Sequence, residues 1–129
     1  MPEEKKSKGK SIEILKADDQ KRIIYGIVLK PDVPDSQDDI MTEDEITKSA
    51  HNYLMFYRNT GVQHEDYADA QIVESYVTPD DMIVNERYVA KGTWIVAMKI
   101  FSDILWTKVK QGDYNAFSAG GYARKEAMV

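Results

Sequence analysis

Cysteine is absent from this 129-residue chain, and histidine occurs only twice. Without cysteine there is no disulfide framework, no thiolate metal site and no cysteine nucleophile. No apolar run approaches the ~18 residues of a membrane span, and the N-terminus lacks the apolar core of a signal peptide. We therefore expect a soluble protein without a membrane segment, and the lack of cysteine fits a reducing compartment.

Basic residues are too few to indicate a nucleic-acid partner. The chain has 17 Lys and Arg against 22 Asp and Glu, which gives a net charge of −5. Nucleic-acid binders usually present a basic face, so this class is disfavoured. The only basic run, in residues 1–10, is interleaved with acids, and we interpret it as a disordered charged tail. Residues 11–129 are expected to form a single domain, large enough to bury a core.

Short β-branched and apolar segments predict a mainly β core. The predicted strands are Ser11–Lys16, Arg22–Lys30, Ala70–Val77, Gly92–Phe101 and Tyr114–Ser118, with Met82–Tyr88 as a short strand or a loop. Gly26 lies inside a predicted strand, which indicates a bulge or a close backbone contact. Gly92–Phe101 is the most hydrophobic segment and should be the central strand, with Trp94, Val96 and Met98 on one face.

Two helices are predicted between the strands. Thr42 and Glu45 have the spacing of a capping box and begin a helix that we expect to run to Asn59. Its apolar stripe should pack on the sheet through Ile46, Leu54 and Tyr57. Ser102 can cap a second helix from Asp103 to about Gln111, with Leu105, Trp106 and Val109 facing inward. The fold class is therefore α+β: a bent, mostly antiparallel, barrel-like sheet with flanking helices.

The stretch Phe117-Ser118-Ala119-Gly120-Gly121 is the candidate for chemistry. Paired glycines allow close backbone approach, so a serine beside them has room for a substrate carbonyl and for backbone N–H donors. A nucleophilic serine needs a base, and the chain offers only His51 and His64. His51 lies off the centre of the helical stripe and is expected at the surface. His64, at a helix-to-strand junction, is the candidate base. The alternative interpretation is an ordinary strand that ends in a Gly-Gly turn.

Several motifs in a fixed order resemble those of the capsid-maturation (prohead) serine proteases of tailed phages, and most closely the XkdF-like phage protease subfamily. They are V-Q-H-E-D around His64, I-V-E-S-Y-V at Ile72–Val77, G-T-W-I-V-A-M-K-I at Gly92–Ile100, W-x-x-V-K-x-G at Trp106–Gly112 and A-F-S-A-G-G-Y-A at Ala116–Ala123. The likeness spans roughly Lys21 to Arg124. Ala119 departs mildly from the family, which usually has a branched apolar residue there.

The resemblance implies a fold similar to the herpesvirus maturational protease. It also implies that His64 is the general base and Ser118 the nucleophile of an endopeptidase that needs no cofactor or metal. Its partners would be phage scaffold and capsid proteins, with neither nucleic acid nor membrane involved, and a homo-oligomer is left open. The implied location is the cytoplasm of the bacterial host, within the assembling prohead.

The resemblance leaves the third member of a catalytic triad unassigned. In the family an acidic residue well downstream of the serine orients the histidine, whereas this chain stops at Val129. Three explanations stay open: Glu126 takes the role at a shorter spacing, the upstream Glu74 substitutes, or the residue lies beyond the end of a truncated chain. Loss of the orienting member of a triad typically costs ~10⁴ in turnover.

Two other functions compete with the protease. One is a catalytically inactive assembly module on the same fold, which would bind scaffold or portal protein through the predicted acidic loop Pro31–Asp39 and through its aromatic side chains. The other is a metal-dependent hydrolase that uses His64, Glu65 and Asp66. Adjacent residues on a strand point to opposite faces, which disfavours a shared metal ion.

Overall fold

A computed structural model describes residues 11–34, 38–57, 70–118 and 123–125. The strands are β1 (Ser11–Asp18), β2 (Ile23–Leu29), β3 (Ala70–Val77), β4 (Met82–Val84), β5 (Arg87–Val89), β6 (Trp94–Ile100), β7 (Ala116–Ser118) and β8 (Ala123–Arg124). The helices are α2 (Glu43–Asn52), which continues into the π-helical turn η1 (Tyr53–Tyr57), and α3 (Asp103–Lys110). The expected tail, residues 1–10, lies outside the described residues.

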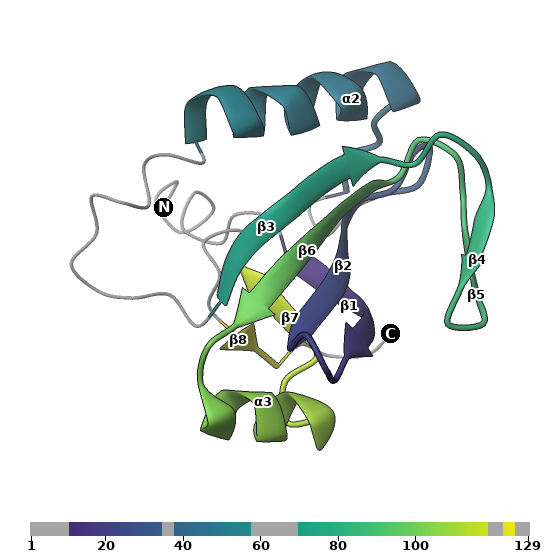
Figure 1. The fold of residues 1–129 in the computed structure, drawn as a ribbon. Coiled ribbons are helices and arrows are strands. Elements are labelled where there is room, and N and C mark those ends of the chain that lie inside the picture. Colours follow the sequence, from purple (N-terminus) through teal and green to yellow (C-terminus); the bar gives the residue numbers. More distant parts are fainter. Residues whose placement is uncertain (1–10, 35–37, 58–69, 119–122, 126–129) are drawn as a thin grey trace.

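Six strands form one antiparallel sheet in the order β3-β6-β2-β1-β7-β8, and β4 and β5 form a separate hairpin. Helices α2 and α3 lie at opposite ends of the twisted sheet, while the β4–β5 hairpin projects to one side (Figure 1). The α+β class and the antiparallel pairing are confirmed. The described sheet is open, because β3 and β8 are its two end strands, and closure into a barrel is not observed.

The hairpin of β1 and β2 turns at the pair Asp18-Asp19, and Asp is a common turn residue. Asp18 Oδ1 accepts hydrogen bonds from the backbone N–H groups of Gln20 and Lys21, both at 3.1 Å. Asp side chains commonly satisfy the backbone of a turn in this way. Arg22 completes the turn with a φ of 57°.

Gly26 is required by a close approach between β1 and β2. A Cβ atom built at this position would lie 2.4 Å from Ile12 Cγ2 and 3.1 Å from the Glu13 carbonyl oxygen. The register between β1 and β2 also shifts between Ile14 and Lys16, opposite Gly26. The predicted bulge or close contact is confirmed, and both features are present.

Strand β6 is buried on both faces and lies between β3 and β2. On one face, Trp94, Val96 and Met98 belong to the main core, as the alternation of side chains predicted. That core also contains Ile100 of the same strand, and it is completed by residues of other elements: Ile12, Ile24, Leu29, Ile46, Ala50, Ala70, Leu105, Trp106, Val109 and Phe117. On the other face, Ile95 packs in a smaller cluster with Leu15, Ile27 and Val89. The prediction of a central strand is confirmed.

Helix α2 begins at the predicted capping box but ends differently from the prediction. Thr42 Oγ1 accepts from the Glu45 N–H at 3.2 Å, and the Glu45 carboxylate accepts from the Thr42 N–H at 2.8 Å. Ile46 and Ala50 are buried, whereas Leu54 is exposed, so its predicted packing is wrong. The π-helical turn η1 shifts the later residues out of the 3.6-residue stripe. The Tyr57 side chain and Asn59 lie outside the described residues.

Helix α3 agrees with its prediction and is attached to the turn between β1 and β2. Ser102 Oγ accepts from the Leu105 N–H at 3.1 Å, and Gly112 with a φ of 86° follows the helix. From this helix, Trp106 Nε1 donates to Asp19 Oδ1 at 3.1 Å and Lys110 Nζ donates to Asp19 Oδ2 at 2.9 Å. Asp19 therefore ties the helix to the hairpin of β1 and β2.

We expect Trp94→Ala to lower the free energy of unfolding by ~3–5 kcal/mol, because it empties a large volume in the core. The Trp94 ring packs against Tyr53 with centroids 5.9 Å apart, and its Nε1 donates to Ser75 Oγ at 2.9 Å. Urea unfolding measures the loss. Phe101→Ala is the control, since Phe101 is exposed and should change stability little. Equal losses in the two variants would contradict the core assignment.

The contribution of Asp19 to stability should depend on pH. The hydrogen bond from Lys110, aided by the one from Trp106, lowers the pKa of Asp19 from its ordinary value of 3.8. A lowered pKa in the folded state gives stability that is present above 3.8 and is lost as pH falls through the folded value. The melting temperature of the wild type should therefore exceed that of Asp19→Asn near neutral pH. A difference that did not shrink toward pH 2 would contradict this role for the charge.

Candidate functional site

The serine of the candidate site ends a short strand in the interior of the sheet. In β7, Phe117 pairs with Ile12 of β1 on one side and with Ala123 of β8 on the other. Ser118 is the register partner of Ser11. Phe117 is fully buried and anchors the strand in the main core. The backbone of Ser118 is thus held by its neighbours, whereas its side chain and the Gly120-Gly121 pair lie outside the described residues.

The candidate base lies on the part of the sequence that joins η1 to β3. His64, with Glu65 and Asp66, lies outside the described residues, between the end of η1 and the start of β3. Ala70, the first residue of β3, is buried in the same core cluster as Phe117. The strand that follows the histidine and the strand that carries the serine therefore rest on one core. Convergence of His64 and Ser118 themselves stays a prediction.

Glu74, one candidate for the third triad member, lies on the end strand β3, and three strands of the sheet separate it from β7. Its side chain is exposed, next to Tyr76. Burial of Tyr76, then the charge of Glu74, raises the pKa of the Tyr76 hydroxyl. The neighbouring Ser75 faces the main core instead, where its Oγ accepts from Trp94. Glu126, the other candidate within the chain, lies outside the described residues.

Among the described residues, no group of three or more His, Asp or Glu side chains could hold a metal ion. The triplet formed by His64, Glu65 and Asp66 is not among the described residues.

No helix in the described ranges is long and apolar enough to cross a membrane. His51 is exposed on α2, as its position off the helical stripe predicted.

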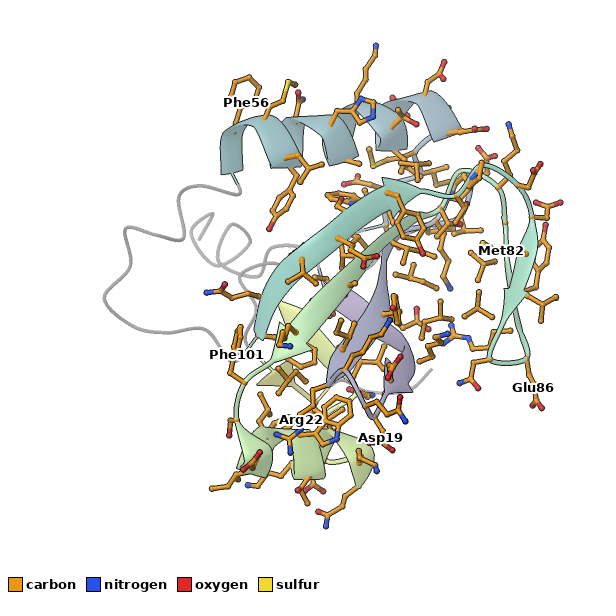
Figure 2. The ribbon with its side chains drawn as sticks, viewed as in Figure 1. Asp19, Arg22, Phe56, Met82, Glu86 and Phe101 are labelled. Carbon is orange, nitrogen blue, oxygen red and sulfur yellow. The ribbon has the colours of Figure 1, made fainter. Side chains whose placement is uncertain are left out.

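The β4–β5 hairpin forms where the sequence predicted a short strand or a loop, Met82–Tyr88, and its tight turn was not predicted. Its two-residue turn is formed by Asn85 and Glu86, both with positive φ (52° and 65°). Asn at the first of these positions is typical of a tight hairpin turn, and this signal could have identified the hairpin. Asn85 Nδ2 donates to the Leu15 carbonyl oxygen at 3.2 Å, and Arg87 forms an ion pair with Glu13. These contacts fix the hairpin against β1, and Glu86 marks its turn in Figure 2.

Comparison with known proteins identifies the family. The chain belongs to the family described as "Putative phage serine protease XkdF", which it matches over residues 11–127. The predicted subfamily is therefore confirmed, and by its description the family is one of phage serine proteases.

Two proteins of Bacillus subtilis (strain 168) are similar to the chain. "Phage-like element PBSX protein XkdF" is 38% identical over 106 residues, which cover 81% of this chain and 38% of that protein. "Uncharacterized protein YqbD" is 37% identical over 116 residues, which cover 88% of this chain and 36% of that protein. The chain thus spans little more than a third of either relative. No solved structure matches the chain, so the expected likeness to the herpesvirus protease stays a prediction.

Should the chain cleave peptide bonds, we expect Glu74→Gln to leave the turnover close to that of the wild type. Glu74 is exposed on an end strand, and three strands separate it from the strand of Ser118. The rate of substrate cleavage by the purified variant measures this. A loss near the ~10⁴ typical of a missing triad member would instead assign Glu74 to the triad.

Proposed function

We propose that the chain forms the catalytic part of a phage serine endopeptidase, with Ser118 as the nucleophile and His64 as the general base. The observation that carries this proposal is the family match over residues 11–127, which includes both residues. The position of Ser118 supports it, because β7 is held between two strands and anchored by the buried Phe117. A nucleophile on a fixed backbone can be kept in one orientation toward its substrate.

In this mechanism, Ser118 Oγ attacks the scissile carbonyl while His64 accepts the hydroxyl proton. The imidazolium returns that proton to the leaving amine, and the acyl group remains on the serine. His64 then takes a proton from water as the water attacks the ester, and returns it to Ser118 Oγ as the acid product is released. Backbone N–H groups near Gly120-Gly121 would stabilise the oxyanion that forms in each half of the reaction.

An acid that orients His64 would complete a triad. Glu74 is disfavoured by its exposed position on β3, which leaves Glu126 or a residue after Val129. An inactive chain that became active when extended beyond Val129 would assign the role to the added residues. In either position, the acid would hold the His64 ring in one orientation and stabilise the imidazolium that forms during the reaction.

The proposed substrates are the scaffold and capsid proteins of the phage or prophage, cleaved inside the prohead in the cytoplasm of the bacterial host. The word "phage" in the family description, and the origin of one relative in a phage-like element, support this choice. Since the chain spans little more than a third of that relative, the activity of the whole protein is part of the proposal.

Ser118→Ala and His64→Ala should each abolish cleavage of the scaffold protein, and the double variant should be no worse than either single variant. Residues that act as a unit in catalysis have non-additive effects. Cleavage is followed by gel electrophoresis after the purified proteins are mixed. Ser11→Ala is the matched control, because Ser11 is the register partner of Ser118 in the neighbouring strand and takes no part in the proposed mechanism. Cleavage that survives in Ser118→Ala would end the serine-protease proposal.

A second candidate function is an assembly module without catalysis. The exposed apolar side chains of the β4–β5 hairpin favour it, since the fold itself does not bury them. Under this alternative, Ser118→Ala phage would assemble normal particles. Under the protease proposal, the same variant would accumulate particles that contain uncleaved scaffold protein.

A further inference from the structure

The outward side of the β4–β5 hairpin carries a pair of exposed apolar side chains, which we call the hairpin patch. Ile83 and Tyr88 lie directly opposite each other in the register of β4 and β5. They are 69% and 65% exposed. Cross-strand pairs of this kind are close neighbours on one face of a hairpin, so the two side chains form one continuous surface.

The inward side of the hairpin already provides its attachment to the body. Val89 is buried with Leu15, Ile27 and Ile95, and Val84 packs against the same cluster. Arg87 Nη1 donates to the Ile14 carbonyl oxygen at 3.4 Å, in addition to its ion pair with Glu13. The hairpin patch is therefore not needed to hold the hairpin. It is presented on a fixed support, which lowers the entropy lost on binding.

The charges around the hairpin patch are acidic. Asp80 and Glu86 are exposed, and neither forms an ion pair with any residue that the structure describes. Asp81 accepts from the Lys91 N–H at 2.8 Å, and its hydrogen bond with the Tyr88 hydroxyl raises the pKa of Tyr88.

The nearby cations are already paired with acids of the body. Arg87 is paired with Glu13, and Lys91 Nζ lies 3.2 Å from Glu43 Oε2. The rim of the hairpin patch is thus negative, and it complements a basic partner. A second copy of this acidic chain would meet like charge at the same rim, which disfavours it as the occupant.

The ion pair that attaches the hairpin to β1 lies beside β7, the strand of the candidate nucleophile. Glu13, which binds Arg87, is the register partner of Ala116 in β7. Ala116 lies two positions before Ser118 in that strand. A polypeptide bound at the hairpin patch would therefore be linked, through Glu13 of β1, to β7, the strand that carries Ser118.

We propose that the hairpin patch is a docking site for a basic, apolar segment of the polypeptide substrate. The substrate class rests on the proposed protease function, whereas the surface itself is defined by the hairpin. Docking outside the cleavage site would raise the affinity for the whole substrate and leave the chemical step unchanged, so it would lower KM and not alter kcat.

The test measures binding of the scaffold protein to the Ser118→Ala protein by biolayer interferometry, which does not require cleavage. The double variant Ile83→Ser and Tyr88→Ser should bind about tenfold more weakly, as expected for loss of an aromatic anchor and its neighbour. Ile104→Ser is the matched control, because Ile104 is 70% exposed on α3, and it should change binding by less than about twofold. Melting temperatures establish that each variant is folded.

A second pair of substitutions tests the acidic rim. Asp80→Asn with Glu86→Gln should weaken binding and reduce its dependence on salt, because exposed charges are screened. Unchanged binding of scaffold protein by the Ile83→Ser and Tyr88→Ser protein would overturn the proposal. A wild-type dimer that these two substitutions dissociate, with scaffold binding intact, would identify a second copy as the occupant instead. Scaffold that binds through the hairpin patch but is never cleaved by the wild type would refute the protease and leave the docking site standing.

Discussion

The burial of β6 on both faces is the constraint on which the rest of the structure depends. Its two faces supply residues to two separate clusters, so the elements on either side of the sheet must pack against this one strand. The main core recruits α2, α3 and Phe117 of β7, and the smaller cluster recruits the β4–β5 hairpin. Through these contacts, the strand of Ser118 and the start of β3 are fixed on one core, and the hairpin is fixed on the opposite face.

Much of the fold could be predicted because its signals are local. Alternation in β6, the capping box of α2 and the turn residues of the β1–β2 hairpin each follow from a few neighbouring residues. The predicted packing of Leu54 on the sheet is wrong because a π-helical turn interrupts the 3.6-residue period. The spacing of apolar residues alone gives no sign of this turn. The strand order also could not be derived, since the neighbours β1 and β7 lie far apart in the sequence.

The sequence predicted which residues could do the chemistry of the candidate site, but it did not predict how they are arranged in space. The scarcity of histidine and the glycines after Ser118 indicated a base and a nucleophile, and the order of motifs indicated the family that the comparisons identify. The geometry depends on packing between distant segments. The hairpin shows this most clearly: Asn85 signalled a turn, but nothing local indicated that the turn would close over Leu15 or leave Ile83 and Tyr88 exposed.

The pairing of Ser118 with His64 is tested most directly by the reaction of the folded protein with a fluorophosphonate, which reacts preferentially with an activated serine hydroxyl and loses fluoride. Mass spectrometry of the digested protein identifies the modified residue. We expect a single adduct on Ser118 that is lost when His64 is replaced by alanine, because the hydroxyl then lacks its base. An adduct on a different serine, or labelling of Ser118 that does not change without His64, would contradict the pairing of these two residues.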